Sequence, residues 1–264
     1  QIKLISNKFN LVSLNDIYKD NLDPERLNIA ITFDDGYKNN YSIAAEILKE
    51  FNTPATFFIT TVKKEGYPYL WADYLDITSY YGHGKLKIDN IEFYKKHEFI
   101  SDKNETLKQI CKKTGFDFKQ KMIKELSRWE NNLYSHDNRN YWELMDENEI
   151  NELSKDNLFT IGSHGLFHNS LESVSLNEAS DEFSESKLFL EKITGKEVEY
   201  FAYPDGSYNS DLIEEAEKIG YKYQLLVEYR YDDKNDHRLK ERFGINPFLN
   251  PKSQIKYISY GKYL

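Results

Sequence analysis

Two adjacent carboxylates, Asp34 and Asp35, follow an apolar run over residues 27–33. Neighbouring side chains in a strand point to opposite faces, so both acids can serve one site only if the strand ends there and the backbone turns. Gly36 is a residue suited to that turn. One carboxylate could then hold a metal ion while the other moves a proton. The alternative is a solvated Asp-Asp-Gly turn after an edge strand.

Two of the six histidines, His164 and His168, lie four residues apart after another short apolar segment. Neutral imidazole is a common zinc ligand, and two histidines at this separation can reach one ion if the backbone coils between them. Gly162 and Gly165 favour a strand end running into a loop over a regular helix. Such a pair is more often incidental on its own. Beside the two aspartates it forms a His2Asp set with open coordination positions, which is typical of catalytic metal.

These segments resemble the motifs of the polysaccharide deacetylases built on the NodB-homology domain. The family's first motif, Thr-Phe-Asp-Asp-Gly, stands unaltered at residues 32–36. Its second, Ser-His-Thr-x-x-His, stands at residues 163–168 with Gly165 in place of Thr. Residues 201–206 read Phe-Ala-Tyr-Pro-Asp-Gly, which is similar to the Phe-Ala-Tyr-Pro variant of the third motif. The resemblance covers residues 11–247, apart from an insertion.

The resemblance implies a metal-dependent hydrolase that removes N-acetyl groups from N-acetylhexosamine units of a bacterial-type surface polysaccharide or its precursor. Asp35, His164 and His168 are the implied ligands of a divalent metal, zinc being the first choice, and Asp34 is the implied base. Such a metal lowers the pKa of bound water from about 16 towards 7. A backbone N–H at Asp205 is implied as a donor to the tetrahedral oxyanion.

The third motif departs from the usual family pattern. Ala202 occupies the place of an arginine that often orients the base. Arg242, just before an apolar triplet, resembles the arginine that such variants carry near the C-terminal strand, so we expect it to pair with Asp34. A surface arginine within the charged stretch 237–242 is an equally good interpretation of the sequence alone.

The late Leu-x-His that supplies a general acid in many members is not found. His237 is the only histidine after His168, and its charged neighbours favour an exposed loop. Metal-bound water, or Asp34 once protonated, could return the proton to the leaving amine. Two alternative functions therefore stay open: a hydrolase of another small amide, or a catalytically impaired glycan-binding protein that retains the metal.

The elements expected to position these residues alternate as a parallel sheet requires. Apolar runs predict strands at residues 27–33, 55–60, 158–161, 198–202 and 223–227, and helical periodicity predicts helices at 40–51, 146–156, 177–194 and 209–220. In the first helix, Ile43, Ile47 and Phe51 form one apolar stripe. With the resemblance, this order predicts an α/β fold, a distorted or incomplete (β/α) barrel in a single catalytic domain spanning the chain.

Residues 62–141 interrupt the alternation and are rich in Lys, Asn, Tyr and charge. We expect a mainly helical insertion or lid made of short helices and loops. Trp71 lies early in it and is either an aromatic on the substrate side or an anchor that packs the insertion against the barrel. His83, His97 and His136 also fall there and receive no role.

Composition excludes several classes of protein. The net charge of −9, from 44 acidic and 35 basic residues, disfavours nucleic acid as a partner, whereas the resemblance implies an N-acetylated carbohydrate. The single Cys111 excludes an intramolecular disulfide framework. No apolar run approaches the roughly 20 residues of a transmembrane helix. The absence of a leader favours the cytoplasm, or the periplasm or exterior if a segment before Gln1 is removed. Oligomeric state stays open.

Overall fold

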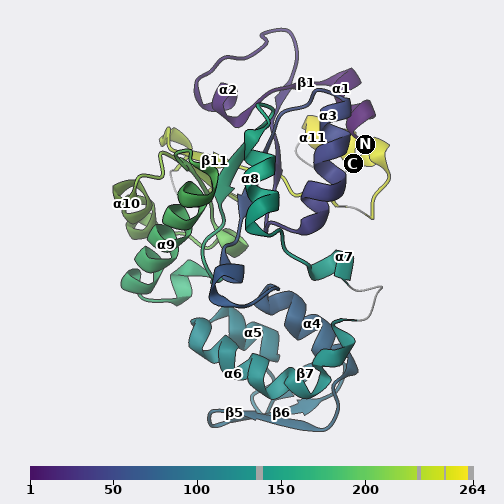
Figure 1. Ribbon diagram of the computed structural model, residues 1–264, viewed down its shortest axis with the longest axis vertical. Helices are drawn as coiled ribbons and strands as arrows, with labels where there is room; N and C mark the ends of the chain where they lie inside the picture. Colours follow the sequence, from purple (N-terminus) through teal and green to yellow (C-terminus); the bar gives the residue numbers. More distant parts are fainter. Residues whose placement is uncertain (135–138, 231–232, 247, 261–264) are drawn as a thin grey trace.

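The computed structural model describes residues 1–134, 139–230, 233–246 and 248–260. Within these ranges, Asn140 is described by its backbone alone. His136 and the end of the family resemblance at residue 247 lie outside the described residues. The chain forms two lobes, one built on a parallel sheet and one formed by the insertion (Figure 1).

The sheet of the larger lobe is the open, partial barrel that the sequence predicts. Among the described residues it has six parallel strands in the order β11-β10-β9-β8-β4-β3. Their bounds are β3 Ile31–Phe33, β4 Ala55–Ile59, β8 Phe159–Ser163, β9 Tyr200–Ala202, β10 Tyr223–Leu226 and β11 Leu239–Glu241. The register aligns Phe57 of β4 with Phe33 on one side and Ile161 on the other. Because all strands run the same way, their carboxyl ends gather at one edge of the sheet.

Helices cover the outer face of this sheet (Figure 1). They are α3 Glu46–Glu50, α8 Glu147–Lys155, α9 Leu176–Thr194 and α10 Ser210–Ile219. The N-terminus adds α1 Ile2–Lys8, α2 Leu14–Tyr18 and a short pair of parallel strands, β1 Asn10–Leu11 and β2 Asn28–Ile29, and the C-terminus adds α11 Pro251–Tyr260. None of the described helices has the length and apolar character needed to cross a membrane.

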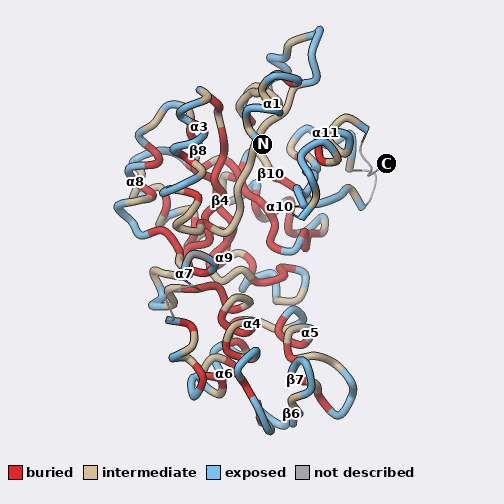
Figure 2. The backbone as a smooth tube through the Cα atoms, turned by 90° about the vertical axis from the view of Figure 1, so that its right-hand side faces the viewer, coloured by how far each residue is buried: buried red, intermediate tan, exposed pale blue. Residues whose placement is uncertain are grey.

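Alternate residues of β4 pack against opposite faces of the sheet. Phe57 and Ile59 join the core beneath the outer helices, whereas Phe58 joins the barrel interior with Leu14 and Leu225. Gly162 of the neighbouring strand makes room for Phe58, since a Cβ there would lie 2.6 Å from the phenyl ring. Burial of each such phenylalanine contributes roughly 1.5–3 kcal/mol. Figure 2 shows the resulting buried layer along the strands.

The two edge strands lie at opposite ends of the strand order, yet the curvature of the sheet brings them together. Arg242, directly after β11, donates a hydrogen bond of 3.1 Å to Thr32 Oγ1 in β3. The guanidinium also lies over the Phe58 ring, with 5.2 Å from Cζ to the ring centroid. The Arg242 side chain therefore joins β11 to β3, two strands that would be paired through their backbones in a closed barrel.

The first predicted helix begins with a π-helical segment, Asn40–Ala45, before α3. The predicted apolar stripe was wrong there: Ile43 and Ile47 are 56% and 41% exposed, whereas Ala45 and Leu48 are buried. A π turn contains more residues than an α turn, so it rotates the following side chains away from the face expected at 3.6 residues per turn.

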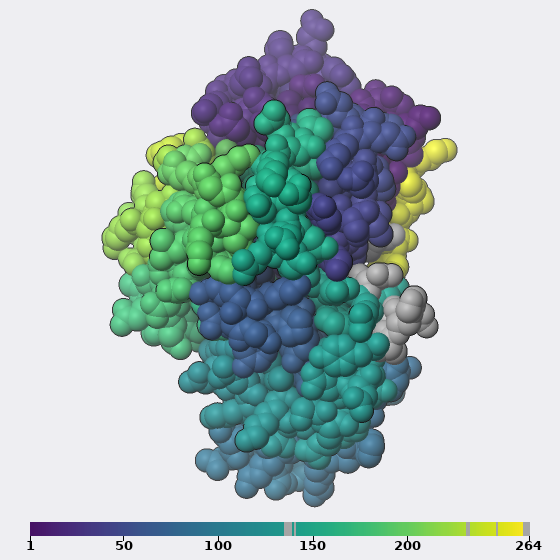
Figure 3. Space-filling model, viewed as in Figure 1, coloured from purple at the N-terminus to yellow at the C-terminus, as the bar shows by residue number. Residues whose placement is uncertain are grey.

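The insertion forms the second lobe with its own core (Figures 1 and 2). Its helices are α4 Trp71–Tyr81, α5 Leu107–Lys112, α6 Phe116–Leu126 and α7 Arg139–Trp142, with 3-10 turns at Val62–Glu65 and Ser127–Asn132. The expectation of helices and loops missed an antiparallel sheet of β5 Lys85–Ile88, β6 Ile91–Lys95 and β7 Phe99–Ser101. The charged residues of β5 alternate with buried Leu86 and Ile88, which is the period of a strand with one solvated face. In Figure 3 the blue and teal surface of this lobe lies directly against the larger lobe.

Candidate active site

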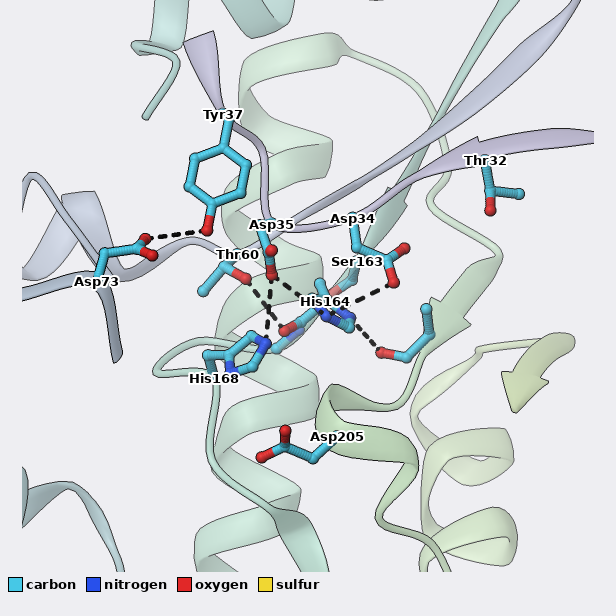
Figure 4. Close-up of polar contacts among 12 residues, drawn as sticks. Thr32, Asp34, Asp35, Tyr37, Thr60, Asp73, Ser163, His164, His168 and Asp205 are labelled. Carbon is cyan, nitrogen blue, oxygen red and sulfur yellow. Dashed lines mark hydrogen bonds and ion pairs between the residues drawn. The ribbon is translucent and has the colours of Figure 1, made fainter. Parts of the chain in front are cut away.

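The carboxyl ends of the strands bring together the residues singled out by sequence (Figure 4). Asp34 follows β3, His164 follows β8, Asp205 follows β9 and Arg242 follows β11. These positions are distant along the chain and adjacent at one edge of the sheet. By contrast His237 precedes β11, at the opposite end of the strands, and is exposed, so it lies away from this edge.

The backbone turns at the first pair of acids as their adjacency requires. Asp35 has a φ of +73° and Gly36 a φ of +83°, and the Gly36 N–H donates to the Asp34 carbonyl at 2.9 Å. A Cβ on Gly36 would lie 3.1 Å from the Ile59 side chain, so this turn favours glycine on both counts. The turn lets both carboxylates lie on the same edge, each with different partners.

Asp35 and the two histidines form a cluster with the donor set of a metal site. Asp35 Oδ1 lies 3.2 Å from His168 Nε2 and 3.6 Å from His164 Nε2, and the three ligand atoms lie within 4.8 Å of one another. Asp35 Oδ1 is buried without a hydrogen-bond partner. A carboxylate oxygen and two imidazole nitrogens that converge in this way suit a divalent cation with open coordination positions.

The partners of His164 fix the nitrogen that it presents. Its Nδ1 lies 2.7 Å from the Ala202 carbonyl and must donate there, because a carbonyl only accepts. Burial lowers the pKa of His164, which keeps the imidazole neutral near pH 7. Nε2 therefore carries the lone pair on the side of Asp35, as a metal ligand requires.

His168 has a different environment. Burial disfavours its imidazolium, but the negative charge of the Asp35 carboxylate, 3.2 Å away, outweighs burial and raises the pKa of His168. Its φ of +55° is uncommon for a residue with a Cβ. The Trp71 indole N–H donates to the His168 carbonyl at 2.9 Å, and Trp71 is only 2% exposed. Of the two interpretations of Trp71, the structure favours the anchor.

Asp34 pairs with Arg242 through two parallel hydrogen bonds. Nη1 donates to Oδ1 at 2.6 Å and Nη2 donates to Oδ2 at 2.8 Å. Burial works against ionisation of Asp34, but the Arg242 charge outweighs it, so the pKa of Asp34 falls below its ordinary value. Asp34 Oδ2 also lies 4.0 Å from His164 Nε2. An ionised carboxylate is thus held beside the cluster of Asp35, His164 and His168 without belonging to it.

The side chain of Asp205 contacts the insertion. Its Oδ1 accepts from Lys112 Nζ at 2.7 Å, and its Oδ2 accepts from Ser170 Oγ at 2.8 Å. Burial opposes ionisation of Asp205, but these two hydrogen bonds outweigh it and lower its pKa. Its φ of +54° forms part of the tight turn after Pro204. The side chain therefore links the third motif to α5, a contact that no motif spacing indicated.

Sequence reasoning missed Asp73 of α4, which approaches the site from the insertion (Figure 4). The Tyr37 hydroxyl donates to Asp73 Oδ2 at 2.9 Å. Burial, together with the charge of Asp35, raises the pKa of Asp73 to about 7 despite the Tyr37 hydrogen bond. The one sequence signal near this contact is Tyr37, directly after the first motif, and a tyrosine alone does not indicate which residue its hydroxyl binds.

Comparison with known proteins places the chain in a family. The family model described as polysaccharide deacetylase matches residues 21–224. The chain belongs to the polysaccharide deacetylase family. The family resemblance of the motifs is thereby confirmed. No curated protein sequence matches the chain significantly.

Solved structures of polysaccharide deacetylases share the fold. The deacetylase PplD of Streptococcus pyogenes, solved with acetate, is 19% identical with a TM-score of 0.53; the alignment covers 95% of this chain and 80% of that one. The deacetylase domain of BpsB from Bordetella bronchiseptica is 15% identical with a TM-score of 0.54, covering 90% and 80%. IcaB from Ammonifex degensii is 14% identical with a TM-score of 0.54, covering 96% and 82%. At these identities the likeness concerns the fold alone.

Proposed function

We propose that this polysaccharide deacetylase is a metal-dependent hydrolase that removes N-acetyl groups from N-acetylhexosamine units of a surface polysaccharide or its precursor. One observation carries the proposal: an Asp-His-His cluster suited to a cation lies beside a carboxylate that an arginine keeps ionised. A nucleophile and a base are the two requirements for attack on an unactivated amide at neutral pH.

Asp35, His164 and His168 would hold the cation, with zinc as the first choice. The buried Asp35 Oδ1 without a hydrogen-bond partner, and the Nε2 lone pair of His164, support this assignment. A divalent cation there would lower the pKa of a coordinated water and polarise the amide carbonyl. The other residues bind, orient and move protons.

Asp34 would act as the general base. Its lowered pKa keeps it ionised at neutral pH, and the two-pronged contact with Arg242 fixes the plane of the carboxylate. Once it has taken the proton from the attacking water, Asp34 can return it to the leaving amine, as one group does in many hydrolases. This return needs no further histidine at the site.

The backbone N–H of Asp205 would stabilise the oxyanion. A main-chain donor is independent of the side chain, which explains how Asp can stand at this position while its carboxylate contacts Lys112 and Ser170. The turn after Pro204 places this residue beyond the carboxyl end of β9, at the same edge as the cluster.

The test combines metal analysis with acetate release from a panel of acetylated chito-oligosaccharides. We expect wild-type protein to hold a divalent cation and release acetate. Asp34→Asn should keep the cation and lose acetate release, whereas Asp35→Ala should lose the cation. Asp156→Ala is the control, because Asp156 lies at the opposite end of β8, and it should behave as wild type.

Three outcomes would count against the proposal. Equal metal content in Asp35→Ala and wild type would refute the coordination. Metal bound without hydrolysis of any amide at saturating substrate would favour the glycan-binding alternative. Hydrolysis of formyl or ring amides, with acetylated sugars left intact, would favour the alternative substrate class.

A further inference from the structure

The segment that carries both histidines is held from two sides. This histidine loop, residues 164–169, leaves β8 and contains two positive φ angles, +79° at Gly165 and +55° at His168. A non-glycine residue in that region costs of order 1–3 kcal/mol and persists only where its surroundings over-determine it. The surroundings of the loop are a helix of the larger lobe and two side chains of the insertion.

From the larger lobe, Glu182 of α9 caps the loop. Its Oε2 accepts from the backbone N–H groups of Leu166 and Phe167 at 2.7 and 2.9 Å, and its Oε1 accepts from Asn169 Nδ2 at 2.7 Å. Glu182 is 2% exposed. Three donors to one buried carboxylate compensate for much of the cost of removing it from water.

The Glu182 carboxylate also explains the departure from the second motif at Gly165. A Cβ at this position would lie 2.8 Å from Glu182 Oε2, closer than real Cβ contacts come. With its positive φ, the position therefore disfavours the threonine of the family motif on both backbone and steric grounds. Glycine at residue 165 and glutamate at residue 182 belong to one arrangement.

From the insertion, Lys119 of α6 completes the network. Its ammonium donates to Asn169 Oδ1 and to the Thr114 carbonyl, the latter at 3.0 Å, and lies 4.8 Å from the ring centroid of Trp71. Lys119 is 0% exposed. The same Trp71 donates to the His168 carbonyl, so the insertion holds the loop at two consecutive residues, 168 and 169.

We propose that Glu182, Asn169 and Lys119 form a buried positioning network that fixes the histidine loop and couples cation binding to the docking of the insertion. The residues at the two ends of the network decide which groups donate and which accept its hydrogen bonds. A lysine can only donate and an ionised glutamate can only accept, so the Asn169 amide between them has one satisfactory orientation. The opposite charges of Lys119 and Glu182 stabilise each other through it. The inference rests on the metal site of the proposed function.

The first test measures the dissociation constant of Zn²⁺ by competition with a chelator. Glu182→Gln and Lys119→Met should each weaken binding about 10-fold to 100-fold, the usual effect of removing a group that supports metal ligands. Matched controls come from the other end of α9. Glu191 accepts the Val198 N–H, and Lys187 donates to the Val198 carbonyl and lies over the Tyr221 ring. Glu191→Gln and Lys187→Met should leave Zn²⁺ affinity at the wild-type value.

The double variant gives a sharper result. Gln at residue 182 places an amide NH2 against the Asn169 NH2, and rotating Asn169 relieves that conflict only by turning its NH2 towards Lys119. With Met at residue 119 the rotation is free. Glu182→Gln with Lys119→Met should therefore lose less affinity than the product of the two single losses. A merely destabilising role would multiply the losses instead.

The second measurement is hydrogen exchange with and without Zn²⁺. In wild type, Zn²⁺ should slow exchange in α4 and α6 as well as in the histidine loop. In Lys119→Met the slowing should be confined to the larger lobe. If a charge deletion prevents folding, Trp71→Phe removes the N–H to the His168 carbonyl while it changes no charge and keeps an aromatic ring beside Lys119, and it should still weaken Zn²⁺ binding severalfold.

The outcomes separate the two proposals. Wild type that binds no divalent cation overturns the metal site and this inference with it. Wild type that binds Zn²⁺, with unchanged affinity in Glu182→Gln and Lys119→Met and no slowing of exchange in the insertion, overturns the network and leaves the proposed function intact.

Discussion

Replacement of Arg242 tests whether this residue keeps the proposed base, Asp34, ionised. Arg242→Met removes the charge and both hydrogen bonds to Asp34, and Arg242→Lys keeps a charge but cannot form the two-pronged contact. Asp34 has its lowered pKa because the guanidinium outweighs the effect of burial. Without the guanidinium, burial is the largest influence left, and the pKa of Asp34 should rise.

The size of the effect follows from the contacts. Each hydrogen bond to a charged group is worth about 1.5–3 kcal/mol, and breaking a buried pair costs about 3–5 kcal/mol. If all of that ~3–5 kcal/mol is lost from the transition state, kcat/KM for Arg242→Met should drop about 100-fold to 5000-fold at neutral pH, with 1.36 kcal/mol for each factor of ten. Arg242→Lys should lose about 10-fold, because one hydrogen bond and the charge remain.

The assay is the pH dependence of kcat/KM for acetate release. The acidic limb, which reports protonation of the free base, should move to higher pH in Arg242→Met and recover towards the wild-type rate in alkali. Arg238→Met is the matched control, since Arg238 lies in the same charged stretch and pairs with Asp236 instead. An acidic limb at the wild-type pH in Arg242→Met, with an undiminished rate, would refute the assignment of Arg242 to Asp34.

Three further predictions concern stability. Gly165→Ala should lower the free energy of unfolding in guanidinium chloride by about 1–3 kcal/mol more than Gly195→Ala, because the cost of positive φ is common to both and only the Cβ at residue 165 is forced into a packed group; equal losses would exclude the contact with Glu182. In metal-free protein, the stability of wild type relative to Asp73→Asn should fall as pH rises from about 4 to 7, because the folded state keeps a proton that the unfolded state has lost; a pH-independent difference would contradict the raised pKa. For Lys119, burial lowers the pKa to about 8, so the folded state releases a proton before the unfolded state does, and the stability of wild type relative to Lys119→Met should rise by up to about 3 kcal/mol between pH 8 and 10; parallel pH curves for the two proteins would show that Lys119 titrates normally.

The sequence predicted which residues meet at the candidate site better than it predicted the residues that support them. Asp34, Asp35 and the two histidines stand in motifs whose order follows the strands, and parallel strands collect their carboxyl ends at one edge. Arg242 was one of two equal interpretations in the sequence, because its partner lies more than 200 residues away. Only the curvature of the sheet brings the two residues together.

The contributions of the insertion could not be predicted. Lys119, Trp71 and Asp73 lie in a segment that resembles a charged surface in sequence, and each gains its role from a contact across the junction of the lobes. A buried lysine has no local signature, since its burial depends on partners supplied by other elements. The strands of the insertion were missed for a different reason: short strands with one charged face resemble loops in composition.

The open sheet places the proposed base, Asp34, between its two edge strands. Asp34 follows the edge strand β3, and Arg242 follows the other edge strand, β11. Their ion pair therefore joins the two edges of an otherwise open barrel. Edge strands unfold locally more readily than the centre of a sheet. Local unfolding of β11 would separate Arg242 from Asp34 while the two histidines stay in place. On mild heating or at low denaturant, the proposed acetate release should therefore stop before a bound metal is lost. The rate of acetate release would then report whether the two edges of the sheet are joined.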